Sequence, residues 1–345
     1  MKETSSHEDV TRQVQKILEE RGRKALEMAK TTVLEEKIES EEVREALKYF
    51  ITEYWHDVAR PALLSIVCEA VGGDPNATIP IAIPMSLISG AIDIHDDIID
   101  ESKSKDSRST VLGKFGKEIA LLAGDALLFK GFNLLQQAVE NGISAEKVKT
   151  ITEIIKETFF ELGDAEALEL KFRERTDITP EEYLRVVKKK AADVEAHTHI
   201  SAIIGNGTKE EIKALSEYGR LLGILIILRD DMIDTLDKEE TIRRIKQEHI
   251  SLPLLFALQN PKIHSTLNEI CRKKKISEND YQKIISSVVE ANGLDLVNNY
   301  MQRIAQESVK LINVVKNNKN LLLLMIKGMT LPEWRDFLSP PNSNG

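Results

Sequence analysis

Two long apolar segments of this chain each end in the same pattern of three aspartates. Residues 79–92 lead to Asp96-Asp97-Ile98-Ile99-Asp100, and residues 221–228 lead to Asp230-Asp231-Met232-Ile233-Asp234. Both segments are apolar nearly all round, which is typical of buried helices. A buried helix that ends in carboxylates must neutralise them or raise their pKa values. The fold must therefore provide for a cation at the end of each helix.

The spacing within each pattern indicates which cation. Residues four apart lie on one face of a helix, so Asp96 and Asp100 lie one above the other, as do Asp230 and Asp234. Carboxylate oxygens suit hard divalent cations, and Mg²⁺ is typically held by one or two carboxylates together with substrate phosphates. A single aspartate pattern would most simply be a solvated face of a helix. Because the pattern occurs twice, the sequence favours two rows of aspartates that face each other around a metal-bound diphosphate.

Composition predicts a single all-α domain. The chain has 345 residues, 42% of them hydrophobic, with 17 glycines and 10 prolines. Long stretches rich in Glu, Lys, Leu, Ile and Ala favour helices, and no run of strict alternation requires a sheet. We expect an N-terminal helical segment over 1–40, a helical bundle around a deep central cavity over 41–338, and a disordered tail over 339–345.

Charge and cysteine content restrict the partners and the compartment. The formal net charge is −9, with basic residues interleaved among acids, which argues against nucleic acid as a partner. Cys68 and Cys271 have no motif spacing and are typical of thiols in a reducing compartment. The polar start over residues 1–9 predicts no signal peptide, and residues 321–326 are too short to span a membrane. We expect a soluble, cytoplasmic protein.

Helical periodicity and stop signals divide the chain into expected elements. Thr179 before Pro180 is an N-cap signal, while Gly205-Asn-Gly-Thr is a stop signal. Residues 71–76 and 101–109 are expected loops. The expected helices cover residues 8–40, 41–59, 79–100, 116–140, 145–173, 180–205, 209–234, 251–259 and 278–318.

Further motifs give the chain a family resemblance over residues 45–260. It resembles the trans-isoprenyl diphosphate synthases. The segments that carry the resemblance, besides the two aspartate patterns, are Val71-Gly-Gly-Asp-Pro, Val111-Leu-Gly-Lys-Phe-Gly, Leu122-Ala-Gly-Asp-Ala-Leu-Leu, Tyr183 to Lys190, and Ser251-Leu-Pro-Leu-Leu. The resemblance implies an all-helical bundle, a homodimer, and Mg²⁺-assisted loss of diphosphate from an allylic isoprenyl diphosphate.

The resemblance also implies roles for individual residues. Asp96, Asp100 and Asp230 would be the principal ligands of Mg²⁺, three ions of which would hold the substrate diphosphate. Asp97, Asp231 and Asp234 would complete the catalytic and metal-binding set. Lys190 matches the family lysine that grips the allylic diphosphate, although it lies in the run Lys188-Lys-Lys, where an ordinary surface lysine is the simpler interpretation.

Departures from the family pattern concern the second diphosphate pocket, which holds isopentenyl diphosphate. Arg60 keeps its place in the first basic motif, but Asp57 stands at the lysine position. Binding a phosphate beside added carboxylates is electrostatically unfavourable. The other replacements are Ser89 for a histidine, Lys105-Asp106 for paired arginines, Ile226-Ile227 for Phe-Gln, and His249 for a lysine. The expected diphosphate-binding residues that remain are Arg60, Lys105, Arg108, Lys190 and His249.

Three functions remain open at this stage. The metal-binding aspartates are all present, whereas the pocket for isopentenyl diphosphate has lost most of its basic residues. This combination favours cyclisation or elimination of the allylic cation, as in a terpene synthase. Alternatively, Lys103, Lys105, Arg108 and Lys114 rebuild the pocket, and the chain is a chain-elongating prenyltransferase. The third candidate is a non-catalytic partner subunit, which would have little reason to retain six motif aspartates.

Positions near the first aspartate pattern bear on substrate size. By the resemblance, Ala91 and Ile92 line the hydrocarbon cavity, with Ile88 one turn further back, and such modest side chains suggest a substrate of fifteen carbons or more. Asp93 could pair with a basic group or add negative potential at the cavity mouth, but simple contact with solvent is the favoured expectation. His197 and His199 are two apart and lie on different sides of a helix, so they are not a zinc pair.

Overall fold

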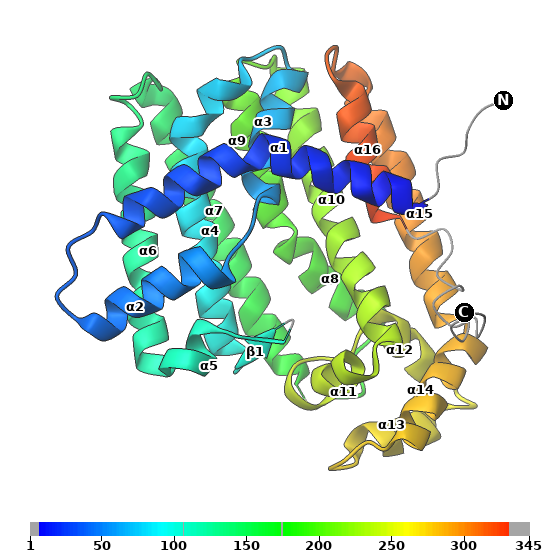
Figure 1. Cartoon of the computed structure of the whole chain (residues 1–345). Helices are drawn as coiled ribbons and strands as arrows, with labels where there is room; N and C mark the ends of the chain where they lie inside the picture. Colours follow the sequence, from blue (N-terminus) through cyan, green and yellow to red (C-terminus); the bar gives the residue numbers. More distant parts are fainter. Residues whose placement is uncertain (1–6, 106, 174, 331–345) are drawn as a thin grey trace, which may run out of the picture.

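The computed structural model describes residues 7–330 except Asp106 and Glu174, and it confirms an all-α fold. The helices pack into one bundle, and α1 crosses in front of it in the view of Figure 1. Asp106 and the tail over 339–345 lie outside the described residues, and the expected domain bounds stay a prediction. The α-helices are α1 (His7–Leu34), α2 (Glu41–Tyr49), α3 (Ala59–Ala70), α4 (Ile79–Ile99), α5 (Val111–Phe115), α6 (Lys117–Gln137), α7 (Ala145–Glu169), α8 (Pro180–Lys190), α9 (Ala192–Ile204), α10 (Lys209–Leu236), α11 (Lys238–Gln247), α12 (Leu252–Leu258), α13 (His264–Arg272), α14 (Glu278–Glu290), α15 (Gly293–Leu311) and α16 (Lys319–Met329).

Short elements join these helices. A two-stranded antiparallel hairpin pairs β1 (Ser104–Lys105) with β2 (Arg108–Ser109), inside the expected loop over 101–109. Such two-residue strands do not change the fold class. The remaining elements are the π-helix η1 (Phe50–Tyr54) and the 3-10 helices η2 (Pro75–Thr78), η3 (Leu170–Phe172) and η4 (Ile312–Val314).

Several helix boundaries differ from the expectation. The segment 41–59 is α-helical to Tyr49 and continues as the π-helix η1 to Tyr54. Helix α3 then begins at Ala59, with Pro61 in its first turn, where the N–H that proline lacks has no partner within the helix. The expected helix over 180–205 breaks at Ala191, and that over 278–318 breaks at Asn292, whose backbone is left-handed (φ 56°). Helices α3, α5, α11, α13 and α16 have no counterpart among the expected elements.

Two N-caps fix the helices that carry the site. The Thr179 side chain accepts from the Glu182 N–H, and Glu182 reaches back to the Thr179 N–H, which confirms the expected start of α8. Thr208 and Glu211 form the same reciprocal pair at the start of α10. Each pair satisfies two backbone donors that a helix start leaves free.

Helix α4 is both long and strongly apolar. Within the described ranges, Pro75–Ile99 alone is long and apolar enough to cross a membrane by length and composition, with mean hydropathy 1.6, yet 67% of its most apolar window is buried. Burial of that kind is typical of a core helix. Gly131 of α6 allows the close packing of α6 on α4, because a Cβ there would lie 2.6 Å from Ile88 Cγ1.

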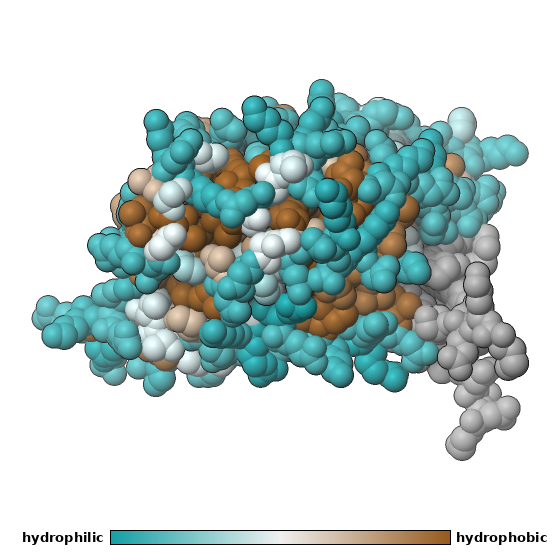
Figure 2. Space-filling model, turned by 90° about the horizontal axis from the view of Figure 1, so that it is seen from above, coloured by the Kyte–Doolittle hydropathy of each residue, from teal (hydrophilic) through white to brown (hydrophobic). Residues whose placement is uncertain are grey.

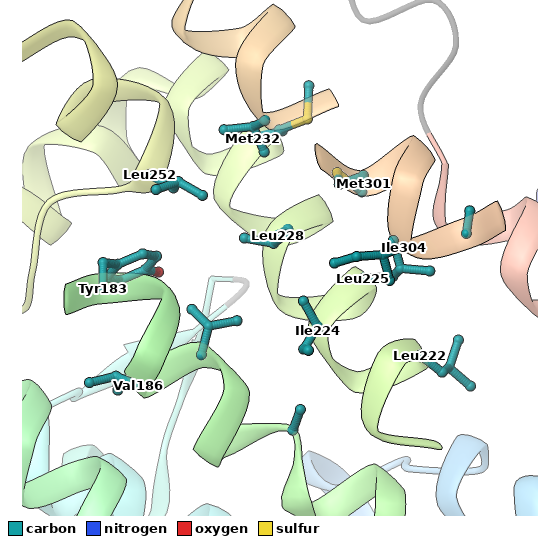
Figure 3. Packing of buried hydrophobic residues seen from close by; sticks show 14 of the residues in the cluster. Tyr183, Val186, Leu222, Ile224, Leu225, Leu228, Met232, Leu252, Met301 and Ile304 are labelled. Carbon is teal, nitrogen blue, oxygen red and sulfur yellow. The ribbon is translucent and has the colours of Figure 1, made fainter. Parts of the chain in front are cut away.

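The largest part of the core is built around α10. Leu225, Leu228 and Met232 of α10 lie between Tyr183 of α8 and Met301 of α15 (Figure 3). All five side chains are fully or almost fully buried. The surface seen from the α1 end is mostly hydrophilic, with hydrophobic residues visible in patches between charged ones (Figure 2). The core thus holds α10 rigidly up to its aspartates.

Candidate active site

The first aspartate pattern lies at the end of α4, where the chain turns into the β1–β2 hairpin. Lys105 of the hairpin places its Nζ 2.7 Å from Asp97 Oδ1 and 3.6 Å from Asp96 Oδ2. Asp97 is buried, whereas 31% of the Asp96 side chain is exposed. Arg173, just after α7, lies 3.1 Å from Asp100 Oδ1 and donates to the Ile99 carbonyl. Asp96 and Asp100 therefore keep oxygens available at the surface of the site.

The second pattern lies near the end of α10, and its middle aspartate is structural. Asp231 is 1% exposed; it accepts a hydrogen bond of 2.9 Å from Tyr183 Oη and another from the Leu252 N–H. Arg244 of α11 lies 2.6 Å from Asp231 Oδ1 and 2.8 Å from Asp234 Oδ2. Asp230 is different, because 57% of its side chain is exposed. Of the three, Asp230 is the most accessible to a ligand.

Lys190 lies between two glutamates of α7 near the first pattern. Its Nζ is 3.0 Å from Glu166 Oε1 and also contacts Glu169. Burial alone would lower the pKa of Lys190, but Glu169, Glu166 and Asp96 outweigh it and raise the pKa. Burial raises the pKa of Glu166 to about 7 despite the lysine. Lys190 is thus a fixed cation with two carboxylate partners that the sequence did not reveal, and its expected contact with the diphosphate stays a prediction.

His249 continues this network toward the second pattern. Its Nδ1 lies 3.2 Å from Glu169 Oε1, and its Nε2 lies within hydrogen-bond distance of Arg244 and of Tyr183 Oη. Burial lowers the pKa of His249 well below its usual value, and the neighbouring Arg244 lowers it further. A neutral imidazole in this position connects α7 to α11 and adds no positive charge for a diphosphate.

The open carboxylates suit a divalent cation. Burial, with Asp96 and Glu248 nearby, raises the pKa of Asp100 to about 6. Burial also raises the pKa of Asp230 to about 6. Arg229 lowers this pKa, while Asp234 raises it further. No group of three or more His, Cys, Asp or Glu side chains in the described part of the chain is already clustered around a metal position. The negative charge of these carboxylates is not fully neutralised by neighbouring cations. Hard oxygen donors of this kind suit Mg²⁺, which substrate phosphates also coordinate.

A surface pocket of about 710 Å³ opens between the end of the first pattern and helix α11. The hairpin after α4 and helix α11 lie at the same end of the bundle (Figure 1). Acidic and basic side chains alternate around the pocket, but none of the five expected diphosphate-binding residues lines it. Its lining consists of Asp100, Glu101, Ser102, Lys103, Ser104, Arg173, Arg243, Lys246 and Gln247.

The basic residues after the first pattern do not gather at this pocket. Lys103 lines it, whereas Lys105 pairs with Asp97. The Arg108 guanidinium lies 5.6 Å from the centre of the Tyr54 ring and donates to the Tyr54 carbonyl, and Lys114 Nζ lies 3.7 Å from the Tyr49 ring centre. Three of the four cations expected to rebuild a second pocket are therefore held elsewhere.

Arg60 is surrounded by carboxylates from three helices or their flanks. Its guanidinium lies 2.8 Å from Asp57 Oδ2, 2.9 Å from Asp193 Oδ2 and 3.3 Å from Asp93 Oδ1. Asp93 also accepts from Trp55 Nε1, so the expectation that it merely contacts solvent is wrong. Burial, only partly offset by Arg60, raises the pKa of Asp93. The guanidinium therefore already has three anionic partners within the protein, although 28% of the Arg60 side chain is exposed.

The space beneath the first pattern is small. A cavity of about 20 Å³ is lined by Ile88 and Ile92 together with Met85 and Phe159. Ala91 is fully buried on another side of α4, in the core that contains Phe50 and Trp55. Ile88 and Ile92 therefore line this small cavity, while Ala91 does not, and the predicted substrate length gains no support from the volume.

Sequence reasoning missed several residues of the site. Glu166, Glu169 and Arg173 recur at helical spacing along one face, a signal that was available. Asp193 and His197 are likewise four apart. Arg244 has no such signal, because it reaches Asp234 from the next helix.

Comparison with known proteins identifies the family. A model of the polyprenyl synthetases matches residues 40–288. The chain belongs to the polyprenyl synthetase family. It is 34% identical over 228 residues to the short chain isoprenyl diphosphate synthase of Methanothermobacter thermautotrophicus, with 66% of each chain covered. It is 29% identical over 283 residues to the geranylgeranyl diphosphate synthase of Methanosarcina mazei, with 80% of this chain and 85% of that one covered.

Solved structures agree on the fold. Geranylgeranyl pyrophosphate synthetase from Pyrococcus horikoshii superposes with a TM-score of 0.82 at 25% identity, covering 95% of this chain and 100% of that one. The family relatives confirm the resemblance inferred from the motifs and the expectation of an enzyme. Their names are those of isoprenyl diphosphate synthases, so they favour the chain-elongating alternative over the terpene-synthase interpretation.

Proposed function

We propose that the chain is a Mg²⁺-dependent enzyme that ionises an allylic isoprenyl diphosphate between the ends of α4 and α10. The observation that carries the proposal is the pair of aspartate patterns at one end of the bundle, each with a partly open carboxylate whose pKa burial raises to about 6. A divalent cation would stabilise the ionised form of these carboxylates. Mg²⁺ also stabilises a departing diphosphate without proton transfer.

The residues divide into ligands and supports. Asp96, Asp100 and Asp230 would hold Mg²⁺, three ions in the family pattern, as the resemblance implies, and each of their side chains is partly exposed. Asp97, Asp231 and Asp234 are paired with Lys105 or Arg244, and they orient the helix ends. Lys190, a fixed cation beside the first pattern, would contact the substrate diphosphate.

The relatives favour prenyl transfer as the fate of the allylic cation. In that reaction the cation is attacked by isopentenyl diphosphate and the product is a longer diphosphate. This is the first candidate, and the names of the relatives support it. The chemistry requires a second diphosphate pocket, and the cations that line the 710 Å³ pocket are Lys103, Arg173, Arg243 and Lys246.

The surroundings of Arg60 favour a second candidate, in which the cation cyclises or loses a proton without a partner. Asp57, Asp93 and Asp193 place three carboxylates within 3.3 Å of one guanidinium. A diphosphate would have to displace them and would meet their charge, at a cost of about 1–3 kcal/mol for each unpaired group. An enzyme that ionises its substrate but excludes isopentenyl diphosphate performs terpene-synthase chemistry.

A product assay decides between the candidates. The purified chain is incubated with Mg²⁺ and farnesyl or geranylgeranyl diphosphate, each with and without isopentenyl diphosphate, and products are separated by chromatography and mass spectrometry. Longer diphosphates that require isopentenyl diphosphate would establish prenyl transfer. Hydrocarbons or alcohols from the allylic substrate alone would establish the second candidate. Turnover by the pure chain would also exclude the non-catalytic subunit.

Assembly and location complete the proposal. Leu121, Leu122 and Phe129 of α6 and Phe160 of α7 are exposed, with Phe129 at 75% and Phe160 at 76%. Exposed large apolar side chains on neighbouring helices are typical of a protein interface. We propose a cytoplasmic homodimer through α6 and α7. Light scattering should give twice the chain mass, and Phe129→Asp with Phe160→Asp should give a monomer.

A further inference from the structure

The pocket between the first aspartate pattern and α11 contains a buried hydroxyl without a partner. Ser102 lines this pocket and is 5% exposed, and its Oγ makes no hydrogen bond with the residues that the structure describes. The backbone of Ser102 is engaged, because its N–H donates to the Asp97 carbonyl at 2.9 Å and its carbonyl accepts from Thr110 Oγ1 at 2.6 Å. Since buried polar groups are normally hydrogen-bonded, a free hydroxyl in a pocket wall indicates a ligand.

Two lysines of the same pocket form no ion pair with any residue that the structure describes. Lys246 of α11 donates from Nζ to the Cys271 carbonyl at 2.8 Å and also to the Lys273 carbonyl. An ammonium group has three donors and carbonyls carry no net charge, so Lys246 is held in place with one donor and its full charge remaining. Lys103 faces Lys246 from the chain that leads into the hairpin, and its backbone is fixed because its carbonyl accepts from the Thr110 N–H at 3.0 Å.

The other cations of the pocket are already paired. Four basic side chains line the pocket against two acidic ones. Arg243 is paired with Glu240 and Glu248. Arg173 lies 3.1 Å from Asp100 Oδ1, so the pocket shares a wall with the first aspartate pattern. The two lysines and the serine hydroxyl are therefore the groups that remain for a ligand.

A diphosphate group suits these donors. Small-molecule sites typically measure about 300–1,000 Å³, and the pocket volume of about 710 Å³ lies within that range. Phosphate oxygens accept strong, charge-assisted hydrogen bonds from ammonium groups and weaker ones from hydroxyls. Ammonium groups do not coordinate Mg²⁺, so such a diphosphate would bind to the protein directly. Prenyl transfer requires two neighbouring diphosphates, and the wall at Asp100 places this pocket beside the metal-held one.

We propose that Ser102, Lys103 and Lys246 bind the diphosphate group of an isoprenyl diphosphate without a metal ion. This inference deepens the proposed function and rests on its first candidate, prenyl transfer, in which two diphosphates are bound at once. The resemblance gives none of these three residues a role, and the site does not use Arg60. Isopentenyl diphosphate and the allylic diphosphate share this chemistry, and the experiment below distinguishes them.

Calorimetry with inorganic diphosphate tests the site without turnover. The full chain is titrated at constant ionic strength in the presence of a chelator, so that no metal-bound diphosphate forms. We expect binding that weakens about tenfold or more in Lys246→Met, which loses a charge-assisted hydrogen bond, and about threefold in Ser102→Ala, which loses a neutral one. Lys274→Met removes the same charge from an exposed neighbour that does not line the pocket, and it should keep the wild-type affinity.

Ser102→Ala keeps the test valid if Lys246→Met does not fold. The Ser102 hydroxyl makes no hydrogen bond with the described residues, so its removal should leave the urea midpoint at or above that of the wild type. Steady-state kinetics of the folded variants with Mg²⁺ then identify the substrate. A KM that rises only for isopentenyl diphosphate assigns the pocket to that substrate, and a KM that rises only for the allylic diphosphate assigns it to the other. Either result supports the site.

Other outcomes separate this inference from the function on which it rests. The site is overturned if the folded wild type binds no diphosphate in the chelator, or if Ser102→Ala and Lys246→Met bind it as tightly as the wild type. Equal weakening in Lys274→Met, or KM values for both substrates that stay unchanged in the pocket variants, also overturns it. Failure of the wild type to join allylic and isopentenyl diphosphate overturns prenyl transfer instead, because the calorimetric binding does not depend on turnover.

Discussion

Replacing Asp100 by asparagine should stabilise the metal-free protein while abolishing its response to Mg²⁺. Burial, with Asp96 and Glu248 nearby, raises the pKa of Asp100 from its ordinary value of 3.8 to about 6. Each pKa unit corresponds to about 1.4 kcal/mol, so a shift of roughly two units sets a ceiling of about 3 kcal/mol. Asp100 is 20% exposed and contacts Arg173 at 3.1 Å. Because solvent exposure and Arg173 both stabilise the ionised carboxylate, we expect the substitution to raise the free energy of unfolding at pH 8 by only about 1–2 kcal/mol.

The sign of the pH dependence follows from the direction of the shift. Because the folded pKa lies above the unfolded one, the contribution of Asp100 to stability is fully present below about pH 4 and is lost as the pH rises through about 6. Asparagine has no such loss. The stability difference between Asp100→Asn and wild type should therefore be greatest at pH 8 and should fall toward zero below pH 4.

Urea unfolding followed by circular dichroism measures both effects. Curves are recorded with a chelator at pH 8 and at low pH, and then at pH 8 with Mg²⁺ and inorganic diphosphate, which stabilise only a protein that binds them. Glu140→Gln, an exposed carboxylate in the α6–α7 turn, is the matched control. The reasoning fails if metal-free Asp100→Asn is less stable than wild type at pH 8, or if it gains as much from Mg²⁺ and diphosphate.

Three further predictions address the rest of the site. Lys190→Met should lower kcat/KM for the allylic diphosphate by roughly 10²-fold, the usual cost of losing one positioned donor to a developing anion; the exposed Lys188→Met should leave steady-state kinetics unchanged. The double change Asp57→Asn and Asp93→Asn should strengthen binding of isopentenyl diphosphate about tenfold or more by freeing a guanidinium, which corresponds to about 1.4 kcal/mol; calorimetry that shows no gain would mean that the carboxylates do not control that pocket. Tyr183→Phe should reduce the free energy of unfolding by about 1–2 kcal/mol, because a buried carboxylate loses a donor; an unchanged urea midpoint would contradict this.

The parts of the fold that periodicity encodes could be predicted from the sequence. The aspartates of α4 and α10 follow apolar runs, and Thr179 caps α8 as its sequence indicates. Helix α3 was missed because Pro61 suggested an end, whereas the proline lies in the first turn. The break at Ala191 leaves no signal, since alanine favours helix and only the packing of α8 and α9 determines the bend.

The site could be predicted only where its residues share a helix. Asp96 and Asp100, or Asp230 and Asp234, are visible as pairs because four residues make one turn. Arg60 meets Asp193 across 133 residues of chain, a contact that no local pattern contains. The functional departures from the family were visible as charge changes, but the way in which those charges pair with one another depends on the tertiary packing.

Release of diphosphate from farnesyl or geranylgeranyl diphosphate tests the central claim most directly. It is measured for the purified wild type and for Asp96→Asn and Asp230→Asn, with isopentenyl diphosphate absent and present, and with Mg²⁺ or a chelator. We predict Mg²⁺-dependent release by the wild type under at least one of the two substrate conditions and a loss of at least 10²-fold in each variant, because both helix ends hold the metal-bound diphosphate. Release that continues unchanged in either variant, or that persists in the chelator, would contradict the account.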